Sequence, residues 1–356
     1  MPIPAVRRIL GHMFEASINR PGVVAPVRID PSGSLGPTPG QARGPRWRRV
    51  GPGWYVPAGA DAAVPEQRTV EVMAGMSGSA ATGWAALRWV GGRWFNGLAS
   101  DGRTWLDVPV ALGDERAVRP RQGAVLSEDW LFKDDVTRID GLRVTIPERS
   151  VTYEARRARD LIRAVQVIDM AACDDLVDLG SLGAYAERLR GRPGMKQLRH
   201  AVGLADENVW SPQETAMRII WTLEGVPRPL LCNRPVFDLT GRHLFTPDLL
   251  DVEAGVAGEY DGVVHLEDGR RRRDLDRDEL TRRLGIEVVT MMAGDRRETH
   301  RFLGRLRGAY QRARERRGPR AWTIEQPAWW VDTSTVARRR ALTERERSVW
   351  LRRRAG

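Results

Sequence analysis

The alternation of apolar and polar positions changes several times along the chain. Residues 21–46 are dense in Pro, Gly and Ser and show no apolar period, and such a composition cannot bury enough surface to order itself. Residues 1–46 are therefore predicted to be a disordered or linker-like segment. From Trp47 onward, short apolar runs alternate with Gly, Asp and Pro, which predicts short strands and turns around a Trp-rich core over 47–146. Helix-like spacing interrupts this pattern at about 64–89.

A helical pattern follows between Pro147 and Leu204, and it predicts a small helical bridge over 147–208. Beyond Gly294 the chain returns to a helical pattern and then to a segment rich in Arg and Trp, so 311–356 is predicted to be a basic C-terminal tail. Charge runs of this kind are usually solvated helix faces and only sometimes contact nucleic acid.

Between these segments, residues 209–310 combine helix and strand patterns. Ser211-Pro212-Gln213-Glu214 is a capping box, with Ser at the N-cap, Pro at the first helical position and Glu at the third, and it predicts a helix to Glu224. Strand-like segments follow at 233–239, 242–250 and 256–266, then a basic helix at about 269–284 and a buried strand at 286–292. The predicted order is helix, three strands, helix, strand, in a chain of mixed α+β or α/β class.

The charge balance of the chain indicates the kind of molecule that it binds. The 356 residues include 57 Lys and Arg against 46 Asp and Glu, for a formal net charge of +11 and a pI of about 10.6. Lysine occurs only at Lys133 and Lys196, so arginine supplies nearly all of the positive charge. Because guanidinium groups bind phosphate bidentately, this composition favours a polyanion such as DNA as partner. A GC-rich genome, which favours arginine codons, is the alternative explanation.

The cysteine and histidine content and the lengths of the apolar runs limit the kinds of site and the cellular compartment that the sequence allows. Only Cys173 and Cys232 are present and the five histidines are scattered, so neither a disulfide framework nor a Cys/His zinc cluster can be assembled. No run approaches the roughly 18 apolar residues of a membrane span, and the first residues lack the pattern of a secretory signal. The chain is predicted to be soluble and cytoplasmic, with no membrane partner.

Three acids are predicted to meet on one hairpin. If its turn is centred between Glu253 and Ala254, Asp248 faces Glu259 directly. Directly opposed residues in an antiparallel pair have Cβ atoms about 4.5 to 5.5 Å apart, close enough for two carboxylates to share one hard cation. Asp261, two residues on, shares the face of Glu259. A bound Mg²⁺ or Mn²⁺ would relieve the repulsion between the carboxylates, polarise a phosphoryl oxygen and lower the pKa of a bound water.

Each of these residues also has a simpler explanation. Asp261-Gly262 is a hairpin turn signal, and Asp248 follows a proline, as in an ordinary bend. His265 is a candidate proton acceptor or water-orienting group, and a structural histidine is the alternative. Glu214 could reach the same metal from the preceding helix, and its capping role explains it equally well.

Three arginines of the predicted basic helix, Arg270, Arg273 and Arg277, lie near one helix face. They are candidates to hold a phosphate backbone. Pairing with Asp274 and Asp278 within the same helix is the competing explanation.

Several motifs taken together resemble a known group of proteins. The motifs are Ser211-Pro212-x-Glu214, Thr246-Pro247-Asp248, Glu259-Tyr260-Asp261-Gly262-x-x-His265, and Arg273-Asp274-x-x-x-Asp278 followed by Leu-Gly and Val-Val-Thr. From about Val209 to Met292 the chain resembles actinobacterial proteins with a very-short-patch-repair-like endonuclease domain, within the P-D…(D/E)-x-K nuclease superfamily. Upstream, RWRRVGPGWYVPA, TGWAALRW and GLRVTIPERSV resemble the antitoxin-like region (AbiEi type) that commonly precedes this domain.

This resemblance implies a restriction-endonuclease-like αβββαβ core over 209–310, DNA as substrate, and a toxin–antitoxin-type partner protein. It implies that Asp248 and Glu259 bind the metal and that Glu214 is a helix-borne acid of the site. Asp261 and His265 would line the site.

Two features depart from the family pattern. Asp261 stands where the superfamily has its lysine, so activation of water would need His265, a second metal or the substrate phosphate. The residues ahead of Trp47 do not have the pattern of the two helices that a winged helix would require.

The sequence thus supports a metal-dependent DNA endonuclease or nickase that hydrolyses phosphodiester bonds. The main alternative is a catalytically inactive, DNA-binding regulator or antitoxin-like protein that keeps the nuclease fold. A third hypothesis is a structural or protein-interaction module, in which the acids are surface residues without a catalytic role and the tryptophans form a surface that binds a partner.

Overall fold

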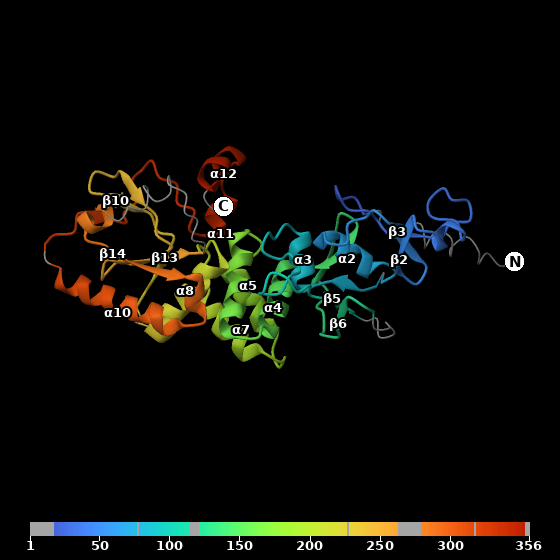
Figure 1. Ribbon diagram of the computed structural model, residues 1–356, viewed down its shortest axis with the longest axis horizontal. Coiled ribbons are helices and arrows are strands. Elements are labelled where there is room, and N and C mark those ends of the chain that lie inside the picture. Colours follow the sequence, from blue (N-terminus) through green and yellow to red (C-terminus); the bar gives the residue numbers. More distant parts are fainter. Residues whose placement is uncertain are drawn as a thin grey trace. The chain divides into compact units, whose positions relative to one another are not determined.

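The computed structural model describes residues 18–76, 78–113, 121–225, 228–262, 279–316 and 318–352. The chain divides into two compact units, Met1–Arg157 and Ala158–Gly356. Each unit contains both helices and sheets (Figure 1), so the predicted mixed α and β class is confirmed.

The first unit has short strands and short helices. In chain order they are β1 (Val27–Arg28), the 3-10 helix η1 (Gln41–Arg43), β2 (Trp47–Gly51), β3 (Trp54–Pro57), α2 (Pro65–Met73), β4 (Ala80–Ala81), α3 (Gly83–Trp89), β5 (Val108–Ala111), β6 (Ala124–Ser127), β7 (Val136–Ile139), β8 (Leu142–Thr145) and α4 (Pro147–Arg157). Helices α2 and α3 lie where the helix-like spacing predicts them.

The N-terminal part of this unit is a three-stranded antiparallel sheet in the order β1-β3-β2. The loop after β1 is held by Asp30, whose Oδ2 accepts the N–H groups of Ser34 and Leu35, each at 2.9 Å. The predicted disordered segment is therefore wrong for residues 18–46. Pairing with β3 supplies backbone hydrogen bonds that the local composition does not reveal.

A five-stranded mixed sheet in the order β6-β5-β4-β8-β7 forms the rest of the first unit. Its core includes Trp89, which is fully buried, and Trp84, which is nearly so. Both indole N–H groups donate to backbone carbonyls, of Ile139 and Asp107 respectively, at 2.9 Å. The predicted Trp-rich core is therefore present, with its polar N–H groups paired, as buried tryptophans require.

The second unit begins with helices and continues with two sheets. Its elements are α5 (Leu161–Cys173), α6 (Leu179–Arg188), α7 (Met195–Leu204), α8 (Pro212–Ile220), the π-helical turn η2 (Trp221–Gly225), β9 (Leu231–Cys232), β10 (Val236–Asp238), β11 (His243–Phe245), β12 (Leu249–Asp251), β13 (Val256–Asp261), β14 (Glu287–Met292), the 3-10 helix η3 (Ala293–Arg296), α10 (Thr299–Glu315), β15 (Trp322–Thr323), α11 (Val336–Arg340) and α12 (Glu344–Trp350). Residues 279–284 are also helical.

The boundary between the units falls inside the predicted helical bridge. Helix α4 belongs to the first unit, whereas α5, α6 and α7 belong to the second. A buried ion pair between Asp169 of α5 and Arg218 of α8, at 2.7 Å, joins these helices to the rest of the second unit. Among the described helices, none combines the length and apolar character needed to cross a membrane.

The main sheet of the second unit has the order β14-β13-β12-β9. Strand β12 is antiparallel to both of its neighbours, β9 and β13, and β14 lies parallel to β13. Helices α8 and α10 pack on one face (Figure 1). On that face Gly258 lies against Trp221, and a Cβ on Gly258 would lie only 2.7 Å from the indole Cζ3, so glycine is needed for the close approach.

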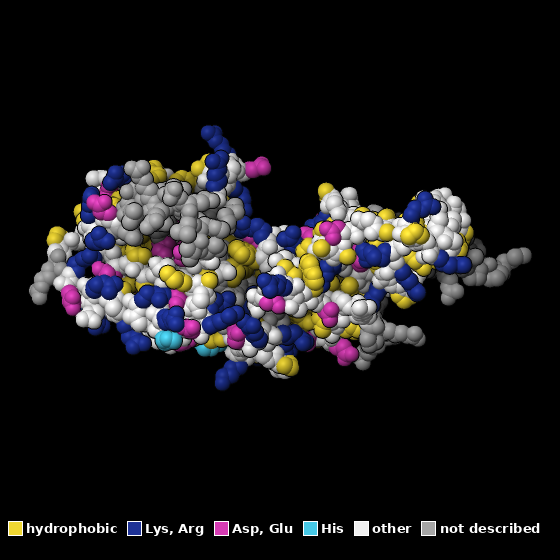
Figure 2. Space-filling model, in the orientation of Figure 1, with side chains coloured by type: hydrophobic (Ala, Val, Ile, Leu, Met, Phe, Trp, Pro, Cys, Tyr) yellow, Lys and Arg dark blue, Asp and Glu magenta, His cyan; other side chains and the backbone are white. Residues whose placement is uncertain are grey.

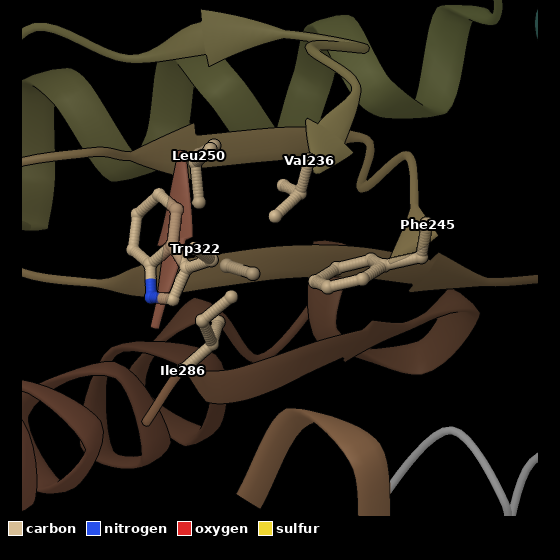
Figure 3. Close-up of a cluster of buried hydrophobic side chains, with 6 residues drawn as sticks. Val236, Phe245, Leu250, Ile286 and Trp322 are labelled. Atoms are coloured by element: carbon tan, nitrogen blue, oxygen red, sulfur yellow. The ribbon is translucent and has the colours of Figure 1, made fainter. Parts of the chain in front are cut away.

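The opposite face packs on a small three-stranded sheet in the order β11-β10-β15. Residues of both sheets point toward one another in an apolar cluster (Figure 3), which consists of Val236, Phe245, Leu250, Ala257, Ile286 and Trp322. The single strand predicted over 242–250 is therefore two strands, β11 and β12, in different sheets. Pro247 lies between them and has no N–H to donate to a ladder.

The C-terminal residues form part of this unit. Strand β15 pairs with β10, and the Arg339 side chain of α11 is fully buried. Its guanidinium donates to Asp175 Oδ1 at 2.6 Å and to the Ala172 carbonyl at 2.6 Å. The predicted basic tail is thus packed over much of 318–352. A run of charged residues predicts side chains exposed to solvent, but an arginine that is paired with an acid can be buried.

We expect Arg339→Ala to lower the free energy of unfolding of the second unit by about 3 to 5 kcal/mol, because the substitution leaves Asp175 and a buried carbonyl without their charged donor. Urea denaturation measures this change. Arg345→Ala, on the exposed surface of α12, is the control and should stay within about 0.5 kcal/mol of wild type. Equal stabilities for the two variants would contradict the assignment.

Candidate active site

The β12–β13 hairpin brings two candidate acids to facing positions. Its register pairs Leu249 with Gly258, and this confirms the turn centre on which the sequence prediction depends. Continued by one residue, the same register sets Asp248 opposite Glu259. The N–H of Tyr260 donates to Asp248 Oδ2 at 2.7 Å, which holds the Asp248 carboxylate against the neighbouring strand.

Asp261 extends the acidic face. It lies two residues beyond Glu259 in β13 and therefore on the same side of the sheet. It is exposed, and it is the last residue of the strand, paired with Met292 of β14. The end of one hairpin thus carries an acid from β13 on either side of Tyr260, with Asp248 across from the first of them.

Glu214 is placed by the start of α8. As predicted, the Ser211 hydroxyl accepts the N–H of Glu214, at 3.2 Å. The carboxylate of Glu214 accepts the N–H of Trp210 at 2.9 Å rather than that of Ser211. Its Oε2 also accepts from the Asn233 side-chain amide at 2.8 Å. The side chain therefore stabilises the helix start and also reaches residues of the sheet.

Glu214 is buried, with only 7% of the residue exposed. Burial, followed by the negative charge of Asp248, raises the pKa of Glu214 from 4.5 to about 7, and the hydrogen bonds from Trp210 and Asn233 oppose this rise. The influence of Asp248 shows that the two acids are electrostatic neighbours. Glu214 therefore gains or loses a proton near neutral pH.

Asn233 is the residue of this site that the sequence does not single out. Its backbone N–H donates to the carbonyl of Asp248 at 2.9 Å, and its amide donates to Glu214 and to the carbonyl of Asn208 at 2.8 Å. Its φ of +45° is left-handed, a conformation that Asn tolerates better than most residues. An Asn just ahead of a proline-containing strand pattern is the weak signal that could have drawn attention to it.

Asp251 is a buried acid of the same hairpin with a different role. It is separated from Asp248 by three positions and so points to the opposite face, toward the helices. The Tyr310 hydroxyl donates to Asp251 at 2.8 Å and accepts from the Trp221 indole at 3.1 Å. Burial, with the hydrogen bond to Asp251, raises the pKa of Tyr310. This network fixes α10 and η2 on the sheet and lies away from the candidate site.

The donor set is suited to a hard cation. Asp248 and Glu259 supply carboxylate oxygens, and Mg²⁺ is commonly bound through one or two carboxylates together with waters and substrate phosphates. In the described part of the chain, no group of three or more His, Cys, Asp or Glu side chains is arranged to hold a metal ion. Of the described carboxylates, those of the facing pair would hold a cation here.

Four predicted site residues, His265, Arg270, Arg273 and Arg277, lie outside the described residues. The described arginines are dispersed among acids over the face drawn in Figure 2. Near the main sheet, for example, Arg312 of α10 pairs with Glu287 of β14 at 2.8 Å. Part of the positive charge of the chain is therefore used in ion pairs within the protein.

Comparison with known proteins does not extend these observations: no protein-family model, curated protein or solved structure matches the chain.

The pKa of Glu214 predicts a dependence of stability on pH. Between about pH 4.5 and pH 7 the folded chain keeps a proton on Glu214 that the unfolded chain has lost, so the free energy of unfolding falls as pH rises through this window, by up to about 3 kcal/mol. Glu214→Gln is neutral throughout and should lack this component. Urea unfolding in EDTA at both ends of the window, with wild type and variant compared, measures it. The same pH dependence in both proteins would exclude the shifted pKa.

Proposed function

We propose that the second unit is a metal-dependent DNA endonuclease or nickase that hydrolyses phosphodiester bonds. The observation that carries the proposal is the hairpin register, which sets Asp248 opposite Glu259. The buried acid Glu214, whose pKa the charge of Asp248 helps to raise, adds a proton-exchanging group at the same place. Acids of this kind are typical of sites that work on phosphate esters with a bound cation.

The topology supports a restriction-endonuclease-like core. Helix α8 is followed by three antiparallel strands of one sheet, β9, β12 and β13, then by helical residues 279–284 and by β14, parallel to β13. This is the αβββαβ order, with the β10–β11 hairpin inserted after its first strand. The sequence resemblance to very-short-patch-repair-like endonucleases agrees with this order.

The chemistry follows from the donor set. Asp248 and Glu259 would hold Mg²⁺ or Mn²⁺, which when bound polarises a phosphoryl oxygen and lowers the pKa of a water. The hydrogen bond from Tyr260 to Asp248 orients one of these carboxylates. Glu214, with its pKa near 7, can take up a proton released close by. Asp261 adds an acid at the exposed edge, and His265, which lies outside the described residues, is the proposed proton acceptor.

The DNA backbone would be held by arginines. The net charge of +11 favours a polyanion, and we assign Arg270, Arg273 and Arg277 to phosphate contacts because they share a helix face in the sequence. Such contacts position a duplex without reading its sequence.

One observation favours a second function. Asp261 stands two residues after Glu259, where the nuclease superfamily has its lysine, so the chain lacks the usual partner for the attacking water at that position. A DNA-binding regulator or antitoxin-like protein, with a toxin-type protein partner, would need the fold and its arginines but no cleavage.

Incubation of supercoiled and mismatched DNA with the protein and Mg²⁺ or Mn²⁺ tests the endonuclease. We expect nicked or linear product, and we expect Asp248→Ala and Glu259→Gln each to slow cleavage at least about 100-fold, because loss of a direct ligand should exceed the effect of losing an outer partner. Gel electrophoresis with time measures the rates.

Glu253→Ala is the matched control, since Glu253 is an acid in the same hairpin with an 81% exposed side chain. It should cleave at the wild-type rate. Cleavage by Asp248→Ala as fast as by wild type would exclude this site. Salt-dependent DNA binding with no cleavage in either metal would select the regulator instead.

A further inference from the structure

A pocket of about 310 Å³ opens next to the candidate acids in the second unit. This volume is at the lower end of the range of roughly 300 to 1,000 Å³ that small-molecule sites occupy. Four tryptophans line it, namely Trp210, Trp329, Trp330 and Trp350. They come from the segment before α8, from the residues after β15 and from α12, so the sequence does not bring them together.

The aromatic rings form a connected wall. Trp330 packs edge-to-face on Trp329 and Trp350, with ring centres 5.5 Å and 5.2 Å apart. Trp330 also stacks on His243, with ring centres 5.0 Å apart and an angle of 28° between the rings. Trp329 is 55% exposed, although it lines the pocket. Exposed indole surface beside a pocket is suited to stacking against a planar ring.

The pocket also presents polar groups. Arg234 lines it, donates through Nη2 to the carbonyl of Ile324 at 3.5 Å, and lies near the carboxylate of Asp332, which also lines the pocket. Arginine carries five N–H donors, so a guanidinium that lines a pocket can donate a hydrogen bond to a ligand as well. Nucleobase carbonyl and ring-nitrogen atoms are suitable acceptors, and so are phosphate oxygens.

Asn233 connects the pocket to the acidic site. It lines the pocket, donates its amide to Glu214, and donates its backbone N–H to the carbonyl of Asp248. Thr246, two residues ahead of Asp248, also lines the pocket and contacts His243 at 3.0 Å through its hydroxyl. A ligand in the pocket is therefore one residue layer away from the proposed reaction centre.

We propose that this tryptophan pocket binds a single unstacked nucleobase of the nucleic acid whose backbone lies at Asp248 and Glu259. The base stacks against the indole wall and accepts a hydrogen bond from Arg234. Bases within an intact duplex are already stacked on their neighbours, so the pocket selects DNA with an unpaired or displaced base, or single-stranded DNA. This inference rests on the proposed function for its choice of nucleic acid, and it adds the substrate class.

The test measures binding without cleavage. Fluorescence anisotropy in EDTA and low salt compares a labelled single-stranded oligonucleotide with an abasic strand of equal length, which keeps the phosphates and lacks the bases. We expect the base-bearing strand to bind more tightly, and Trp329→Ala to weaken its binding about 5- to 100-fold, as loss of one stacking partner does. The abasic strand should bind wild type and Trp329→Ala equally.

Two further variants sharpen the result. Trp105→Ala, in the first unit, removes a tryptophan of similar exposure, 48%, and should leave both affinities unchanged. Trp329→Phe keeps a stacking ring and should recover most of the lost affinity, which separates stacking from a folding defect. Three results would contradict the proposal that the pocket binds a nucleobase: equal binding of both strands by wild type, an equal loss of affinity for both strands in Trp329→Ala, or no oligonucleotide binding at all.

The outcome is independent of catalysis. If the protein shows the Trp329-dependent preference for bases but cleaves no DNA, the endonuclease proposal fails and the pocket stands. If it cleaves DNA through Asp248 without any base preference, the pocket fails and the endonuclease stands.

Discussion

The buried amide of Asn233 is the contact on which the second unit most depends. The side-chain amide donates to Glu214 at the start of α8 and to the carbonyl of Asn208 before that helix, and the backbone N–H of Asn233 donates to the carbonyl of Asp248. A buried amide must have its donors satisfied, because each unpaired group costs about 1 to 3 kcal/mol. This requirement fixes the helix against the sheet edge, and Glu214 is thereby held beside Asp248.

The same constraint has electrostatic consequences. A carboxylate that is buried next to a second acid resists ionisation, which accounts for the raised pKa of Glu214. The hydrogen bonds that hold Glu214 in place act in the other direction. The structure keeps an acid close to its ionisation point at the place where two further carboxylates face each other, and a shifted pKa at such a place marks a candidate functional site.

The acids of the β12–β13 hairpin lie on two faces of the sheet. An acid on one face stabilises the packing of the helices, and those on the other form the proposed active site. Asp251 points to the helices and is tied to Tyr310, whereas Asp248 points to the side that also carries the small sheet and the tryptophan pocket. Strand alternation alone produces this result. Two acids three residues apart in one hairpin thus serve the core and the proposed active site.

The sequence by itself determined the start of α8, the places of α2 and α3, and the register of the hairpin. The capping box located the start of α8, and the spacing between Asp248 and Glu259 located their facing positions, because caps and tight hairpins depend on residues close together in the chain. Only the tertiary structure decided the roles of Asn233 and Arg339, the ordering of residues 18–46, and the tryptophan pocket. These depend on contacts between segments distant in sequence, whose pairing and burial no local pattern encodes.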